Sequence, residues 1–130
     1  MPDNSPRPRI VIAEDHGGLL EKVAGLLQRE FDVVAKVTDG KSALQCAIEL
    51  EPHVLLLDLY IPEMNGLEVV RALKKLNTRT APVIMSGSED LEIAEAAVAA
   101  GAALFVGKSR LLSELIPVMR QAAQRAGSSR

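Results

Sequence analysis

Aromatic residues are scarce in this 130-residue chain: they make up 2% of the sequence, and there is no tryptophan. Hydrophobic residues nevertheless reach 48%. A hydrophobic core must therefore be built from aliphatic side chains. A chain of this length is about one domain long, and it can bury roughly two-thirds of the surface that it exposes when unfolded.

Disulfides, membrane spans and a basic excess are missing as well. The single cysteine, Cys46, excludes an internal disulfide and a multi-cysteine metal site, which favours a reducing compartment. No apolar run approaches the ~18 residues of a membrane helix, and residues 1–9 lack the apolar segment of a signal peptide. A net charge of −2 gives no excess of basic residues of the kind that binds nucleic acid. We expect a cytoplasmic domain that itself binds neither membrane nor nucleic acid.

The ends of the chain differ in composition from its middle. Pro2, Pro6 and Pro8 stand among polar residues and predict a disordered lead over residues 1–8. The middle, residues 9–124, has no linker or repeat and is predicted to be one domain. Residues 125–130 are predicted to be a disordered tail.

Strand-like and helix-like segments alternate through the middle of the chain. Strands are predicted at 9–13, 31–37, 53–58, 82–86 and 102–107. Helices are predicted at 19–27, 41–51, 65–76, 89–101 and from Leu111 onward. Parallel strands need long crossovers, so this alternation predicts a doubly wound α/β fold with helices on both faces of a parallel sheet. Ligands bind such sheets beyond the carboxyl ends of the strands.

Polar residues stand where four of the predicted strands end: Glu14-Asp15, Asp58, Ser86 and Lys108. Taken singly, each could be a helix cap or a solvated turn residue. Together they are predicted to meet at one edge of the sheet, where three carboxylates repel each other unless a cation joins them. Carboxylates of this kind suit Mg²⁺. Lys108 adds a positive charge and Ser86 a hydroxyl, so the set could surround a phosphoryl group transferred onto an aspartate.

With these residues in place, residues 9–124 resemble the receiver domains of two-component response regulators. The resemblance depends on Glu14-Asp15, on the segment LLLDLYIPEMNG around Asp58, on Ser86-Gly87, and on the run Phe105 to Lys108, in this order. It implies a five-stranded parallel sheet in the order 2-1-3-4-5, flanked by five helices. It also implies a signalling domain that catalyses only its own phosphorylation and dephosphorylation, and is not otherwise an enzyme.

The resemblance gives each strand-end residue a role. Asp58 is expected to accept a phosphoryl group from the phosphohistidine of a sensor histidine kinase or a phosphotransfer protein. Ser86 is expected to hydrogen-bond the phosphate and Lys108 to pair with it. Phe105 occupies the family's aromatic switch position and is expected to turn inward when Ser86 moves.

The same resemblance assigns a Mg²⁺ site. Asp15 and Asp58 are expected to ligate the ion, Glu14 to do so through a water, and the backbone carbonyl of Tyr60 to complete the set. Tyr60 and Ser88 lie two residues after Asp58 and Ser86, and we expect both to modulate the site. Our hypothesis for the Tyr60 side chain is that it gates the water that hydrolyses the phosphoaspartate.

The chain departs from the family pattern at two positions. Ser109 stands where most relatives have a proline after the lysine. A non-proline cis bond costs about 3–4 kcal/mol, so we predict a trans Lys108–Ser109 bond. This lysine–polar pair is typical of receivers attached to helix-turn-helix output domains. Gly87 stands where relatives usually carry alanine, which is expected to leave the phosphoacceptor more accessible.

Partners and competing functions follow from the same residues. Besides the kinase, we expect an output domain or partner in transcription. A homodimer is expected through the face of residues 89–101, 102–107 and the last helix, or through the first and last helices. A haloacid dehalogenase would need an aspartate at Tyr60, and a flavin domain would need a phosphate-binding loop in place of EDHGGLL. A stand-alone or degenerate receiver that only binds proteins remains the alternative.

Overall fold

The computed structural model describes residues 6–87 and 90–126. Its strands are β1 (Arg9–Ala13), β2 (Asp32–Val37), β3 (Val54–Asp58), β4 (Ala81–Ser86) and β5 (Leu104–Gly107). Its helices are α1 (Gly17–Leu27), α2 (Gly40–Leu50), α3 (Gly66–Lys75), α4 (Leu91–Ala99) and α5 (Leu111–Arg125). A short 3₁₀ turn, η1 (Lys108–Arg110), joins β5 to α5. None of the helices in these described residues is both long enough and apolar enough to cross a membrane.

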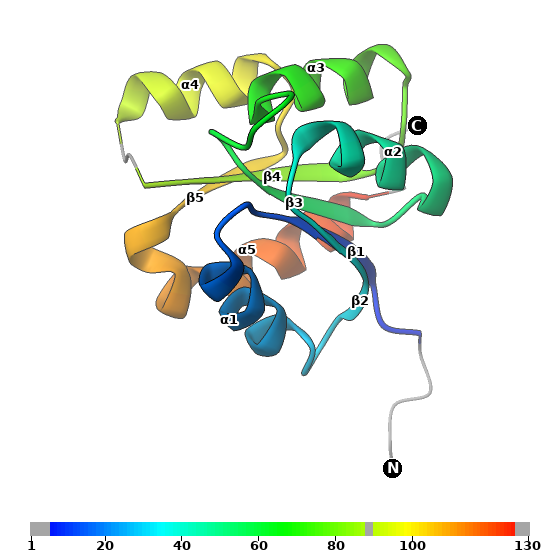
Figure 1. The fold of residues 1–130 in the computed structure, drawn as a ribbon, viewed down its shortest axis with the longest axis vertical. Helices are drawn as coiled ribbons and strands as arrows, with labels where there is room; N and C mark the ends of the chain where they lie inside the picture. The colour runs from blue at the N-terminus through cyan, green and yellow to red at the C-terminus, as the bar shows by residue number, and fades with distance from the viewer. Residues whose placement is uncertain (1–5, 88–89, 127–130) are drawn as a thin grey trace.

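The five strands form one parallel sheet in the order β2-β1-β3-β4-β5, which confirms the predicted fold. Helices α1 and α5 cover one face, and α2, α3 and α4 cover the other (Figure 1). From β1 the chain continues to β2, which lies on one side of β1, and then to β3, which lies on the other side. The order of connection therefore reverses between β1 and β3, where ligands bind in sheets of this kind.

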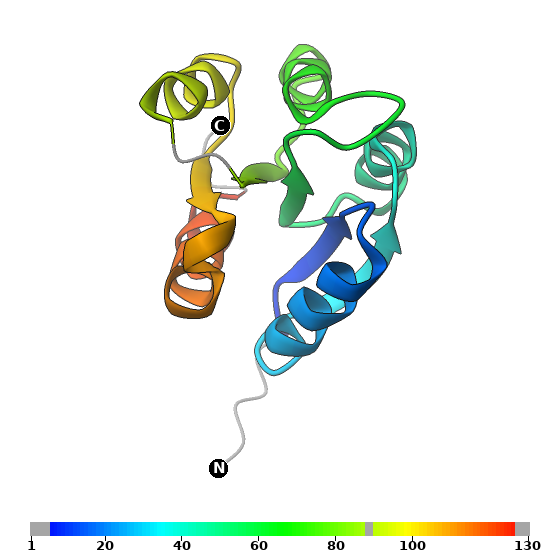
Figure 2. The ribbon, with the colours of Figure 1, turned by 60° about the vertical axis from the view of Figure 1, so that its left-hand side comes forward.

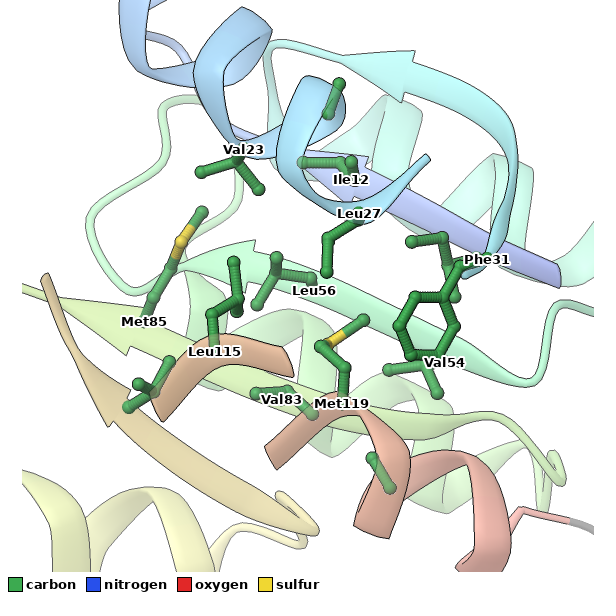
Figure 3. Close-up of a cluster of buried hydrophobic side chains, with 14 of the residues drawn as sticks. Ile12, Val23, Leu27, Phe31, Val54, Leu56, Val83, Met85, Leu115 and Met119 are labelled. Atoms are coloured by element: carbon green, nitrogen blue, oxygen red, sulfur yellow. The ribbon is translucent and has the colours of Figure 1, made fainter. Parts of the chain in front are cut away.

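The core is aliphatic, as the composition predicted. Beneath α1 and α5, side chains such as Leu56, Leu115 and Met119 are fully buried and point toward one another (Figure 3). The ring of Phe31 closes this cluster at one end. Every residue of β3 is buried, because helices cover both faces of this central strand. Replacing one of the buried leucines by alanine is expected to cost about 2–5 kcal/mol.

The ends of several elements differ from the predicted ranges for local reasons. Strand β3 begins at Val54 and not at His53, whose imidazole Nδ1 accepts a hydrogen bond from the Arg9 amide at 3.0 Å. Helix α4 ends at Ala99, because Gly101 adopts a positive φ of 111° that stops the helix. Helix α5 reaches Arg125, one residue past the predicted end of the domain.

At the start of the domain, Arg7 donates to the Gln28 carbonyl at 2.8 Å and the Pro8 carbonyl accepts from Asp32 at 2.9 Å. Contacts thus reach slightly beyond 9–124 at both ends. The rest of the predicted lead and tail, residues 1–5 and 127–130, lies outside the described residues, as does the predicted modulator Ser88.

Candidate functional site

The predicted site residues come together at the carboxyl edge of the sheet. Asp58 is the last residue of β3 and is 5% exposed, and Ser86 is the last residue of β4 and is fully buried. Glu14 follows β1 directly, and Lys108 follows β5. Strand register explains the gathering: Asp58 pairs with Met85, and Ser86 pairs with Gly107. Parallel strands in this register end together, so the residues that follow them share one edge.

Three carboxylates meet beside the switch point between β1 and β3. One oxygen of each of Glu14, Asp15 and Asp58 lies within 4.8 Å of the others. Glu14 is fully buried, whereas Asp15 is exposed. Glu14 Oε2 accepts a hydrogen bond from the His16 amide at 3.0 Å, which holds the carboxylate in place at the start of α1. Asp15 is therefore the exposed member of the cluster.

Lys108 supplies the positive charge that these buried acids require. Its Nζ lies 2.9 Å from Asp58 Oδ1 and 3.0 Å from Glu14 Oε1. Burial by itself lowers the pKa of Lys108, but hydrogen bonds and charge attraction from Asp58 and Glu14 outweigh it, so the pKa is raised. The lysine therefore stays an ammonium ion at neutral pH. No peptide bond in the described residues is cis, which confirms the predicted trans Lys108–Ser109 bond.

The loop from Asp58 to α3 is tightly folded. The Leu59 amide donates to Met85 at 2.9 Å, and the Gly66 amide donates to the Leu59 carbonyl at 2.8 Å. A Cβ on Gly66 would lie 2.9 Å from Leu59 Cα and 3.0 Å from the Asp58 carbonyl oxygen. Only glycine fits this turn without displacing backbone atoms. Within the loop, Tyr60 is 66% exposed.

The predicted switch residue Phe105 lies on β5 and is half-buried. Its ring packs against the core beneath α2, α3 and α4, and it lines a small surface cavity together with Leu91, Arg110 and Glu114. Apart from its neighbours in the chain, no described residue places an atom within 4 Å of the position where a Cβ of Gly87 would stand. That Gly87 makes the phosphoacceptor more accessible stays a prediction. The inward rotation of Phe105 stays a prediction.

The donor set fits a hard divalent cation. Glu14 Oε1 is fully buried, and its partner is the Lys108 ammonium at 3.0 Å. Carboxylate oxygens gathered at this spacing are the ligands that Mg²⁺ prefers. The acidic cluster could therefore bind a metal. An ammonium beside Asp58, a hydroxyl at the end of the neighbouring strand β4 and two further carboxylates are also the kinds of group that a phosphoryl acceptor needs.

Two features of the site had not been predicted. The first is the pair of ion contacts that Lys108 makes to Glu14 and Asp58, since a long side chain can take many directions from a known backbone position. The second is Gly40 at the start of α2, against which the loop after β3 packs. The sequence marks Gly40 only as half of an Asp-Gly turn.

Comparison with known proteins agrees with this geometry. Residues 10–120 match the model of the response regulator receiver domain family. A Pseudomonas aeruginosa protein described as a transcriptional regulator is 34% identical over 109 residues, or 83% of this chain and 53% of that protein. The transcriptional regulatory protein PrrA of Mycobacterium tuberculosis is 28% identical over 122 residues, or 94% of this chain and 52% of PrrA. The chain thus spans about half the length of these relatives.

Solved receiver domains share the fold. The signal receiver domain of a response regulator described as NarL, from Mycobacterium tuberculosis, has a TM-score of 0.89 and 28% identity, covering 92% of this chain and 98% of that one. A DNA-binding response regulator of the LuxR family from Staphylococcus aureus has a TM-score of 0.84 and 26% identity, covering 89% and 98%. The family match, the strand order and the strand-end residues agree, and the chain belongs to the response regulator receiver domain family.

Proposed function

We propose that this domain receives a phosphoryl group on Asp58 from the phosphohistidine of a sensor histidine kinase or a phosphotransfer protein. The observation that supports this most is the environment of Asp58. A carboxylate 5% exposed at the end of the central strand is met by the Lys108 ammonium at 2.9 Å, and two further acids lie beside it. Such an arrangement is costly for stability alone, because buried charges lose their hydration.

The transfer is a substitution at phosphorus. A carboxylate oxygen of Asp58 forms the new O–P bond, the P–N bond of the phosphohistidine breaks, and its electron pair stays on the histidine nitrogen. Lys108 then gives up part of its contact with Asp58 and pairs with a phosphoryl oxygen. The Ser86 hydroxyl donates a hydrogen bond to another phosphoryl oxygen. The domain catalyses only this reaction and the later hydrolysis of the phosphoaspartate.

Mg²⁺ would be held by Asp15 and Asp58, by Glu14 through a water, and by the backbone carbonyl of Tyr60. When bound, the ion offsets the negative charge of the phosphoryl oxygens. Asp15 is the exposed one of the three carboxylates. The Glu14 carboxylate is buried, and the hydrogen bond from the His16 amide holds it in one orientation.

The phosphoryl group carries about −1.5 to −2 units of charge, which replaces the single negative charge of the Asp58 carboxylate. This charge draws Ser86 and Lys108 inward, and Phe105 turns into the space that Ser86 leaves. The face of α4, β5 and α5 changes as a result and controls an output domain or a partner. The names of the full-length relatives support an output in transcription. Homodimerisation through this face, or through α1 and α5, and a cytoplasmic location belong to the same proposal.

Acetyl phosphate and Mg²⁺ provide the test, read by the intact mass of the protein. We expect wild type to gain one phosphoryl group, which Asp58→Asn does not gain. Asp32→Asn is the matched control, since this exposed aspartate begins β2 at the opposite edge of the sheet, and it should react like wild type. A wild type that gains no phosphoryl group would instead be a degenerate receiver that acts only as a protein-interaction module.

A further inference from the structure

The loop that follows Asp58 rests against the first residue of α2. The Gly40 amide donates a hydrogen bond to the Pro62 carbonyl at 3.0 Å. A Cβ on Gly40 would lie 1.6 Å from the Met64 carbonyl oxygen and 2.6 Å from its carbon. The loop therefore occupies the space that any other side chain at this position would need. Figure 2 shows this loop, in green, extending over the start of α2, in teal.

The start of α2 is a firm support for the loop. Gly40 is buried, and the preceding Asp39 caps the helix by accepting hydrogen bonds from the Ser42 amide at 2.7 Å and the Ser42 hydroxyl at 2.8 Å. The Ala43 amide donates to the Asp39 carbonyl at 3.1 Å. Because these contacts hold the helix terminus in place, a new side chain at Gly40 would displace the loop and not the helix.

The other end of the loop is held in the same way. Gly66 packs against the backbone of Leu59 and Asp58, as described above. Between the two glycines, the Met64 amide donates to the Pro62 carbonyl at 2.9 Å, which tightens the turn. Tyr60 lies on the stretch between these supports, next to the phosphoacceptor. Its backbone position is therefore set by contacts at both ends of the loop.

We propose that Gly40 is a positioning residue for the phosphoacceptor site: its missing side chain seats the 62–64 segment on α2 and thereby holds the Tyr60 carbonyl where it can ligate Mg²⁺. This inference rests on the proposed function. A methyl group at Gly40 must move the Met64 carbonyl by about 1.4 Å to reach even a tight contact of 3.0 Å. Mg²⁺ demands near-ideal octahedral geometry, and loss of a ligand's support typically lowers metal affinity by about 10- to 100-fold.

The chain carries its own probe of this loop. Tyr60 is the only tyrosine and there is no tryptophan, so the intrinsic fluorescence of the protein reports on the loop alone. The experiment titrates Mg²⁺ into wild type and Gly40→Ala, followed by tyrosine fluorescence and by calorimetry. We expect the Mg²⁺ dissociation constant of Gly40→Ala to rise by roughly 10- to 100-fold. Its tyrosine signal should also differ from that of wild type before any Mg²⁺ is added.

Two control variants separate positioning from folding. Gly25→Ala makes the same chemical change in α1, where nothing lies within 4 Å of the new methyl group, and should bind Mg²⁺ like wild type. Leu115→Ala removes a fully buried core side chain far from the loop, so it should lower the melting temperature without changing Mg²⁺ affinity. If Gly40→Ala does not fold, Pro62→Gly loosens the same segment without adding an atom and should weaken Mg²⁺ binding.

The outcomes are distinguishable. Wild-type Mg²⁺ affinity in Gly40→Ala, or in Pro62→Gly where that variant is needed, would overturn this inference and leave the proposed function standing. A wild-type protein that binds no Mg²⁺ and takes no phosphoryl group from acetyl phosphate would overturn the proposed function, and this inference with it. Weakened Mg²⁺ binding in Gly40→Ala, with both controls unchanged in affinity, supports the inference.

Discussion

Replacing Lys108 by methionine removes the ammonium that contacts two buried carboxylates while keeping an unbranched side chain. In the structure, Lys108 Nζ lies 2.9 Å from Asp58 and 3.0 Å from Glu14, which are 5% and 0% exposed. Without the ammonium, these two acids would face each other in a site that offers little water. We expect Lys108→Met to be less stable than wild type and more dependent on Mg²⁺.

The magnitude follows from the burial of the group. Removing one partner of a fully buried ion pair costs about 3–5 kcal/mol, because the other charge is left without compensation. The Lys108 side chain is 26% exposed, so solvent screening lowers the expected loss to about 2–3 kcal/mol. For a domain of this size, each kcal/mol corresponds to roughly 4 °C in melting temperature. Lys108→Met should therefore melt about 8–12 °C below wild type in the absence of Mg²⁺.

Thermal unfolding followed by circular dichroism at neutral pH, with and without Mg²⁺, is the assay. An ion present at about a hundred times its dissociation constant stabilises the folded protein that binds it by about 2.7 kcal/mol. In the variant, no ammonium competes with Mg²⁺ for the carboxylates. Mg²⁺ should therefore raise the melting temperature of Lys108→Met more than that of wild type. Lys41→Met is the control, since this lysine is 73% exposed and lies 4.0 Å from Glu63. Equal melting temperatures of Lys108→Met and wild type without Mg²⁺ would refute the reasoning.

Three further predictions concern the same edge of the sheet. Because the pKa of Lys108 is raised in the folded protein, the stabilisation by its ammonium is complete below the ordinary pKa of 10.5 and is lost as the pH rises through the pKa of the folded state. The free energies of unfolding of wild type and Lys108→Met, measured with urea, should therefore converge in strong alkali. By the same method, the free energy of unfolding of Gly66→Ala should be about 1–3 kcal/mol lower than that of wild type, because the new methyl group meets backbone atoms. Gly87→Ala has open space for its methyl group, so its free energy of unfolding should stay within about 0.5 kcal/mol of wild type. Tyr60→Ala should shorten the lifetime of the phosphoaspartate if the exposed ring gates water, and equal dephosphorylation rates would end that hypothesis.

The fold could be predicted because its strands are nearly continuous apolar runs. The run from Val54 to Leu57 predicted a strand buried on both faces, and the structure places it at the centre of the sheet. The ends of the elements were harder to predict, because single side chains decide them. The His53 imidazole accepts a hydrogen bond from the Arg9 amide beside the start of β3, and Asp90 caps α4 by accepting from the Glu92 amide. Neither contact has a signature in the hydrophobic pattern.

The membership of the site could be predicted, but its internal contacts could not. Residues at the carboxyl ends of parallel strands must share an edge, which was enough to bring Asp58, Glu14 and Lys108 together. Side-chain packing decides which carboxylate oxygens the Lys108 ammonium contacts, and it also decides that Glu14 is completely buried. The close approach of Met64 to Gly40 joins two segments far apart in the sequence, and only the folded chain brings them into contact.

Locating the phosphoryl group on the chain tests the central claim most directly. After reaction with acetyl phosphate and Mg²⁺, borohydride reduction converts an aspartyl phosphate to homoserine, and the mass of the proteolytic peptide that contains the modified residue identifies the position. We predict homoserine at position 58 and at no other aspartate or glutamate. Reduction at Asp15 or Glu14, or an unmodified Asp58 in a protein that has gained a phosphoryl group, would contradict the account.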